Sequence, residues 1–201
     1  MPKLYLITNR KLVKNHNFFH VINESIKGGV DTIILREKDL NEQELISYGK
    51  KIKEIIGYRK VKLIINGNFN AMKAVKANGY HMKFKDFLDK KPKNVFVGVS
   101  VHSLEEAMIC EEKSVDYILV SHIYLTDCKK GLKPKGVNFI KEVRSKVSMP
   151  IIALGGINPE NAKETIENGA DGVAVMSYIM ASEEPFISAK KLKENIKIVT
   201  G

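Results

Sequence analysis

The stretch PIIALGGINPEN, residues 150–161, contains the unit from which the fold of this chain can be worked out. A short apolar run, Pro150 to Leu154, leads into two glycines, and Asn158 with Pro159 then supplies a helix N-cap and a first helical residue. The run does not alternate apolar with polar residues, which is typical of a parallel strand covered on both faces. The stretch therefore predicts a buried strand, a glycine turn and a helix, in that order.

Comparable apolar runs recur along the whole chain. There are eight of them: LYLI at 4–7, TIIL at 32–35, KLII at 62–65, GYHM at 79–82, VFVGV at 95–99, YILV at 117–120, PIIAL at 150–154 and GVAVM at 172–176. Helical segments lie between them. Residues 41–56 begin with Asn41 followed by Glu44, and residues 103–112 begin with Ser103 followed by Glu106, which is the pattern of a capping box.

Strand and helix alternating eight times fit either an open doubly wound sheet or a closed barrel. Eight repeats favour the barrel, so we predict an α/β fold, a compact (β/α)8 TIM barrel of eight parallel strands, as one domain over residues 1–201. Because this length is near the lower limit for the fold, we expect short loops and a stunted helix around residues 86–90.

Composition limits the functions open to the chain. With 44% hydrophobic and 28% charged residues it is expected to fold, and no apolar stretch approaches the roughly 20 residues of a membrane span. The start resembles no secretory signal, and Cys110 and Cys128 form no paired-thiol motif, so a cytoplasmic protein with two reduced thiols is expected. The sequence leaves open whether the chain forms a homo-oligomer.

Lys and Arg exceed Asp and Glu by 33 to 23, and this net charge of +10 attracts anions. The lysines are spread over the expected helices and the chain has no Trp, which argues against a nucleic-acid surface. A phosphorylated small molecule as partner accounts for the charge equally well.

In a TIM barrel the chemistry lies at the carboxyl ends of the strands, and polar residues follow nearly every predicted strand. Gly155 and Gly156 after the seventh strand, with Met176 and Ser177 after the eighth, offer backbone N–H groups to a phosphate. The alternative is a glycine turn that only lets helix and strand pack. Two such features at neighbouring strands favour the phosphate site.

His122 follows the sixth strand at the expected rim, where an imidazole could accept a proton from one carbon and return it to another. A purely supporting position is an equal alternative on spacing alone. No Cys or His spacing indicates zinc, and Asp86 alone would make a poor magnesium site, so we expect no metal.

Over nearly its whole length the chain resembles the thiamine phosphate synthase superfamily, a (β/α)8 group. The resemblance rests on LYLIT near the start, LREK at 35–38, LIIN at 63–66, GYHM followed by Asp86, VGVSVHSLEEA at 97–107, DCKKG at 127–131, PIIALGGI at 150–157 and GADGVAVMS at 169–177. The synthase of this superfamily joins an aminopyrimidine diphosphate to a thiazole phosphate and holds magnesium diphosphate with aspartates after the third and fourth strands.

The chain departs from the synthase pattern in the diphosphate and pyrimidine half of the site. Asn66-Gly67-Asn68 stands where the synthase has Asn-Asp-Arg, Ile34 where it has Gln, and Lys83-Phe84 where it has Gly-Gln, although Asp86 after the fourth strand remains. His122 replaces a proline and Cys128 a threonine. Together with NG after the third strand and TDCKKG, these changes are similar to the thiazole tautomerase (TenI) branch, although Ser121 replaces its glycine.

The tautomerase resemblance implies an isomerase, free of metal and cofactor, that converts a carboxythiazole phosphate with an exocyclic double bond into its aromatic tautomer in thiamine biosynthesis. His122 would carry the proton, Arg36 and Lys38 would face the carboxylate, and the thiazole would be lined by Asn66, Thr126, Asp127 and Cys128. For Lys38 a plain surface position is an equal alternative. Two rival functions stay open: thiamine phosphate synthase with altered metal binding, and a non-catalytic regulator that binds thiamine-related phosphates or nucleic acid.

Overall fold

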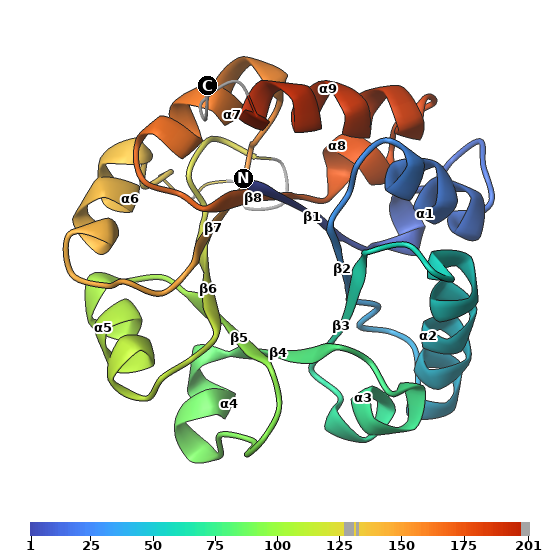
Figure 1. The fold of residues 1–201 in the computed structure, drawn as a ribbon, viewed down its shortest axis with the longest axis horizontal. Coiled ribbons are helices and arrows are strands. Elements are labelled where there is room, and N and C mark those ends of the chain that lie inside the picture. Colours follow the sequence, from blue (N-terminus) through green and yellow to red (C-terminus); the bar gives the residue numbers. More distant parts are fainter. Residues whose placement is uncertain (127–130, 132, 198–201) are drawn as a thin grey trace.

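The computed structural model describes residues 1–126, 131 and 133–197, and its eight strands close into a barrel in chain order (Figure 1). The strands are β1 (Lys3–Ile7), β2 (Thr32–Leu35), β3 (Lys62–Asn66), β4 (Gly79–Lys83), β5 (Val97–Val101), β6 (Tyr117–Ser121), β7 (Ile151–Leu154) and β8 (Gly172–Val175). All neighbours are parallel, and β1 pairs with β8 to close the ring. The predicted TIM barrel is confirmed, with strand ends within two residues of those expected.

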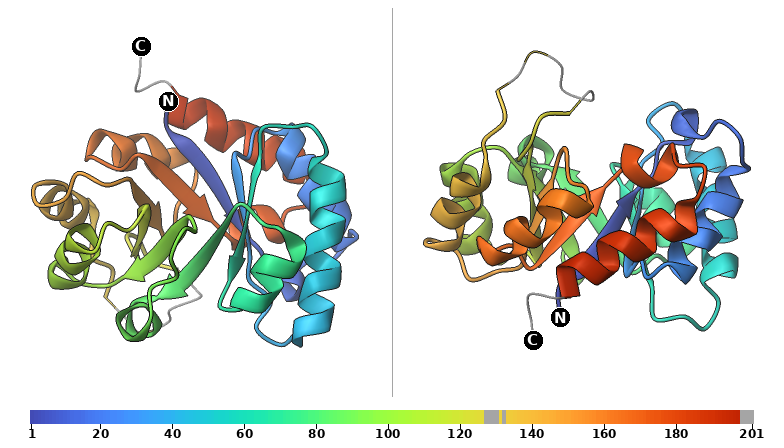
Figure 2. Two further views of the ribbon diagram at one scale, coloured as in Figure 1. Left: turned by 60° about the horizontal axis from the view of Figure 1, so that its bottom comes forward. Right: turned by 90° about the horizontal axis from the view of Figure 1, so that it is seen from above.

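Helices surround the barrel on its outside (Figures 1 and 2). They are α1 (Phe18–Lys27), α2 (Glu42–Ile56), α3 (Phe69–Val75), α4 (Phe84–Asp89), α5 (Leu104–Glu112), α6 (Val137–Arg144), α7 (Pro159–Glu167), α8 (Ser177–Met180) and α9 (Pro185–Lys197), with a short 3-10 turn η1 (Arg10–Leu12). The helix after β4 is short, as predicted, but it begins at Phe84 rather than near residue 86.

The predicted N-caps explain where three helices begin. Asn41 and Asn158 form capping boxes at α2 and α7, and Pro159 occupies the first helical position of α7. At α5 the Ser103 side chain accepts from the Glu106 backbone N–H, but the Glu106 carboxylate accepts from the His102 N–H instead of the cap itself. This one-residue displacement ties the end of β5 to the first turn of α5.

Two apolar clusters hold the fold together. The larger one fills the space between the outer faces of the strands and the helices. The smaller one fills the barrel interior and consists of Tyr5, Ile7, Ile34, Ile64, Tyr117, Leu119, Ile152 and Ala174. Gly98 of β5 makes room for the Tyr117 ring, since a Cβ at this position would lie 1.9 Å from Tyr117 Cζ. These side chains fill the middle of the barrel, and cavities lie at both ends, one of about 530 Å³ at the amino-terminal end and two at the carboxyl end.

The last helix covers the seam of the barrel. Helix α9 packs against α1, α7 and α8 (Figure 1). From it Lys193 reaches Asp31, whose carboxylate also accepts from the Leu4 backbone N–H at 2.7 Å. This contact links the chain's final helix to β1 and to the start of β2.

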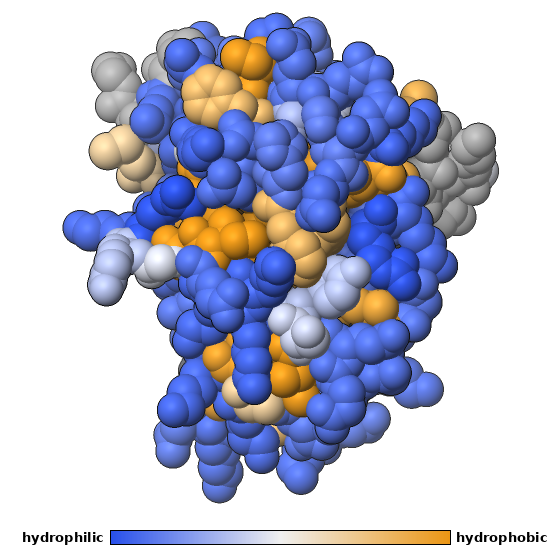
Figure 3. All heavy atoms as spheres, turned by 90° about the vertical axis from the view of Figure 1, so that its right-hand side faces the viewer, coloured by the Kyte–Doolittle hydropathy of each residue, from blue (hydrophilic) through white to orange (hydrophobic). Residues whose placement is uncertain are grey.

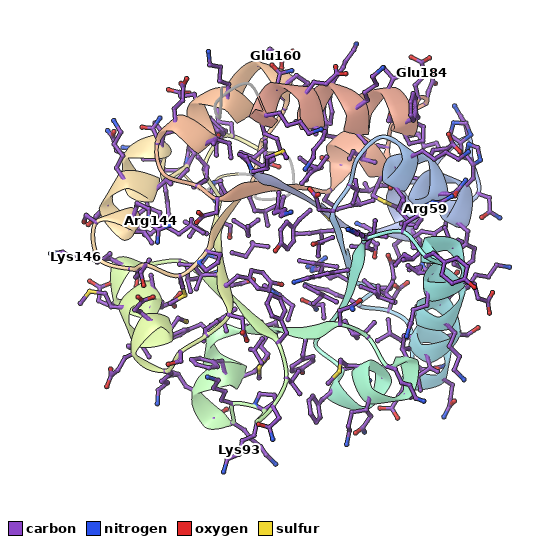
Figure 4. All side chains as sticks on the ribbon, in the orientation of Figure 1. Arg59, Lys93, Arg144, Lys146, Glu160 and Glu184 are labelled. Carbon is purple, nitrogen blue, oxygen red and sulfur yellow. The ribbon has the colours of Figure 1, made fainter. Side chains whose placement is uncertain are left out.

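The outer surface is mainly polar. Figure 3 shows a largely hydrophilic face with scattered apolar patches, and Lys93, Lys146, Glu160 and Glu184 lie at the outer edge of the molecule in Figure 4. In the described part of the chain, no helix is both long enough and apolar enough to cross a membrane.

Candidate functional site

Two adjoining cavities lie at the carboxyl ends of the strands, where the fold places its chemistry. The smaller measures about 100 Å³ and the larger about 320 Å³. Both are lined by Ser121 at the end of β6, Leu154 at the end of β7 and Met176 after β8, so these three residues form a shared wall. The mouth of the barrel can therefore hold two chemical groups side by side.

The smaller cavity is built by the loops after β6, β7 and β8. Its lining includes His122, Thr126, Gly155, Gly156 and Ser177. His122 is buried, with 5% of its surface exposed. The lining thus brings together the predicted histidine and the predicted phosphate loops, which come from three separate parts of the sequence.

The two glycines in the lining of the smaller cavity are required by the backbone conformation. Both have positive φ, +105° at Gly155 and +68° at Gly156. A Cβ on Gly155 would lie 2.4 Å from the Cβ of His122, and one on Gly156 would lie 2.3 Å from the carbonyl oxygen of Leu125. The glycines therefore let the loop after β7 pack on the loop after β6, so the packing role and the exposed backbone occur together.

The larger cavity is lined by cations from neighbouring strands. Arg36 and Lys38 follow β2, Asn66 ends β3 and Lys83 ends β4. The pKa of Lys38 is lowered, first by the charge of Arg36, then by partial burial, and then by the charge of Lys83. The three cations are therefore close enough to repel one another, and the cavity has a positive field suited to an anion.

A buried histidine forms the floor of this cavity. His81 Nδ1 lies 2.9 Å from the Tyr117 hydroxyl, and its Nε2 lies 2.8 Å from Ser100 Oγ. Burial, with a smaller contribution from Arg36, lowers the pKa of His81 to about 3, so its ring is neutral. A neutral imidazole has one donor and one acceptor nitrogen, and it links the barrel interior to a hydroxyl at the cavity wall.

His81 and Lys83 were not among the predicted site residues. Strand register is the signal that could have found them. Successive side chains of β4 point to opposite faces of the sheet, so His81 and Lys83 lie on the same face. His81 pairs with Asn66 of β3, and Lys83 pairs with Ser100 of β5. Because Asn66 was already expected at the mouth, this pairing places both residues of β4 beside it.

Other polar residues near the mouth support the loops. The Glu37 carboxylate is buried and accepts from the Arg10 backbone N–H at 3.0 and 3.1 Å. The Thr8 hydroxyl accepts from the Arg36 backbone N–H at 3.0 Å, and Asn9 caps η1. The loops after β1 and β2 are thereby joined, which positions Arg36.

The remaining predicted residues divide into two groups. Thr126 lines the smaller cavity, and Asn66 lines the larger. Asp127 and Cys128 lie outside the described residues. Within the described ranges, no group of three or more His, Cys, Asp or Glu side chains is arranged to hold a metal ion.

Fold and site together define a class: a (β/α)8 barrel whose mouth is lined by glycine-containing loops after β7 and β8 and by cations after β2 and β4. The thiamine monophosphate synthase (TMP-TENI) family matches residues 4–179. The chain belongs to this family.

Individual relatives agree with the family. The chain is 35% identical to a thiamine-phosphate synthase of Clostridium acetobutylicum, over 98% of this chain and 92% of the relative. It is 36% identical to one of Desulfitobacterium hafniense, over 95% of both chains. Among solved structures, a thiamine phosphate pyrophosphorylase from Pyrococcus furiosus superposes with a TM-score of 0.87 at 28% identity, covering 99% of this chain and 97% of the other.

These relatives overturn the expected tautomerase. Curated proteins 31–36% identical over most of the chain are named thiamine-phosphate synthase, so the assignment as a thiazole tautomerase, and with it the isomerase class, is wrong. The expectation failed because each replaced residue was compared by itself, while its surroundings depend on the fold. The structure places Ile34, Asn66 and Lys83 in the lining of one larger cavity beside the smaller one.

Proposed function

We propose that this protein is a thiamine-phosphate synthase, which joins an aminopyrimidine methyl diphosphate to a hydroxyethylthiazole phosphate. The observation that carries the proposal is the pair of adjoining cavities with a shared wall. A two-substrate transfer needs two anionic groups held apart with their reacting atoms together, and proximity of this kind contributes much of an enzyme's rate. The names of the curated relatives support the same activity.

In this proposal the thiazole phosphate occupies the smaller cavity. Backbone N–H groups around Gly155, Gly156, Met176 and Ser177 would bind its phosphate, as loops after the last two strands do in many TIM barrels. His122 and Thr126 line the same space and would contact the thiazole ring. The phosphate anchor would turn the ring toward the shared wall.

The pyrimidine diphosphate occupies the larger cavity, with its diphosphate against Arg36, Lys38 and Lys83 and with Asn66 alongside. The thiazole ring nitrogen would form a bond to the pyrimidine methylene carbon while the carbon–oxygen bond to diphosphate breaks. The electron pair of that bond leaves with the diphosphate. Cations already placed around the leaving group stabilise the charge that develops on it.

The superfamily resemblance implies magnesium at the diphosphate, and the residues present do not fit that ion. Hard divalent cations take several oxygen ligands, preferably carboxylates. The polar lining described for the larger cavity is Arg36, Lys38, Asn66, His81, Lys83, Ser100, His102 and Ser121, which contains no carboxylate. We therefore derive no step of the reaction through a metal ion.

The direct test is to mix purified protein with both substrates, in parallel with magnesium and with a chelator. Thiamine phosphate and diphosphate should appear in equal amounts only when both substrates are present. The Gly156→Ala variant should lose most of this activity, since its Cβ would displace the loop after β6. Absence of thiamine phosphate under both metal conditions would overturn the proposal.

A further inference from the structure

The larger cavity contains a cation that the local structure does not favour. Lys83 occupies the N-cap position of α4 and makes no side-chain capping hydrogen bond. Ser, Thr, Asp and Asn stabilise this position, and a positive charge opposes the helix dipole there. A lysine at this point therefore weakens the helix, and its exposed side chain lines the larger cavity.

The three cations of this cavity have no ionic partner among the described residues. No ion pair involves the side chain of Arg36, Lys38 or Lys83, whereas Arg10 and Lys11 share Asp39 at 2.9 and 3.0 Å. Like charges gathered without a counterion repel one another, and the lowered pKa of Lys38 reports that repulsion. An anion with several negative charges relieves it.

Among the described residues, the carboxylates near this cavity do not line it. Both oxygens of Glu37 accept from the Arg10 backbone, and Asp39 pairs with Arg10 and Lys11. Asp86 is exposed on α4 and lines neither cavity of the mouth; burial first, and then the Asp86 charge, raise the pKa of Tyr80. Tyr80 belongs to the outer core rather than to the barrel interior. A divalent cation in the cavity would thus meet three positive side chains and no described carboxylate.

We propose that Arg36, Lys38 and Lys83 bind a diphosphate group directly, with Lys83 supplying charge that a divalent cation would otherwise supply, so that the site takes diphosphate without metal. The identity of the diphosphate-bearing ligand rests on the proposed synthase function. The metal-independent binding of diphosphate by these three cations does not rest on it. Lys83 donates from the end of β4, opposite Ser100 of β5, while Arg36 and Lys38 donate from the loop after β2.

The test is calorimetric titration of the full chain with inorganic diphosphate, in chelator and in magnesium. We expect binding in chelator that magnesium does not tighten. Lys83→Ser should weaken it about tenfold or more, because one charge-assisted contact is lost. The same substitution supplies a favourable N-cap, so its melting temperature should equal or exceed that of the unmodified protein, which separates lost binding from lost folding.

Two control variants complete the design. Lys85→Ser removes an exposed lysine two residues away that lines none of the described cavities, and it should leave diphosphate affinity unchanged. Lys83→Arg keeps the charge and should retain most of the affinity. Binding that requires magnesium, or equal affinity in the unmodified protein and Lys83→Ser, would overturn the inference.

The outcome separates this inference from the proposed function. Metal-free diphosphate binding that depends on Lys83, without thiamine phosphate formation, would support the metal-independent diphosphate site and refute the proposed synthase function. Thiamine phosphate formation together with magnesium-dependent diphosphate binding would support the proposed synthase function and refute the metal-independent diphosphate site.

Discussion

At the scale of the residue, the neutral His81 shows how the barrel interior sets the properties of the mouth. Its ring is held between Tyr117 and Ser100, and burial lowers its pKa to about 3. In the unfolded chain a histidine titrates near pH 6.5. Below that pH the unfolded chain takes up a proton that the folded protein does not, so the free energy of unfolding must fall with falling pH.

We therefore expect stability to decline between pH 6.5 and pH 5 by on the order of 1 kcal/mol per pH unit through this residue. This interval lies above the titration of ordinary carboxylates. Urea denaturation at several pH values measures it. His81→Gln should flatten the decline, and His20→Gln, at an exposed position on α1, should not. An unchanged slope in His81→Gln would contradict the assignment.

At the scale of the element, the packing of β5 against β6 depends on the small size of Gly98. Gly98 lies where a Cβ would be 1.9 Å from Tyr117 Cζ and 2.4 Å from its hydroxyl. Tyr117 is fully buried between Tyr5 and Phe96, with ring centroids 5.6 Å away on both sides, so it cannot move aside.

Gly98→Ala should destabilise the protein by roughly 1–3 kcal/mol through overpacking. Tyr117→Ala opens the same space, so the double variant should lose less than the sum of the two single losses. Thermal or denaturant unfolding of the four proteins measures this coupling. Additive losses would show that the tyrosine ring does not limit the size of residue 98.

At the scale of the whole molecule, a contact between distant parts of the chain fastens α9 to the first strands of the barrel. Lys193 of α9 is 12% exposed and reaches both Asp31 and the Pro2 carbonyl oxygen. Removing its ammonium group would leave the partly buried Asp31 carboxylate without its cation.

Lys193→Met should cost about 1–3 kcal/mol of stability. Lys190→Met on the same helix is the matched control, because Lys190 pairs with Glu194 at 4.0 Å with both side chains more than half exposed. Exposed pairs of this kind contribute about 1 kcal/mol or less. Equal losses in the two variants, measured by denaturant unfolding, would argue against a role for the Lys193 contact in holding α9 to the barrel.

The sequence by itself determined the order and type of the elements. Eight apolar runs, the caps at Asn41, Ser103 and Asn158, and the glycines after β7 act through neighbours a few residues away, and such local signals can be read along the chain. The same local reading placed His122 at the rim after the sixth strand, and the structure shows that it lines the smaller cavity. It could not determine the reaction, and the tautomerase expectation failed there.

Only the tertiary structure decided which polar residues share a cavity. Lys83 lines the same cavity as Arg36 and Lys38, although these two residues lie more than forty positions earlier in the chain. The barrel brings them together because β2 and β4 both neighbour β3. Whether a lysine is a surface charge or part of an anion site depends on which charges surround it and which carboxylates are already engaged. Those are properties of the closed barrel, because electrostatic energy depends on distance in space and not on separation along the chain.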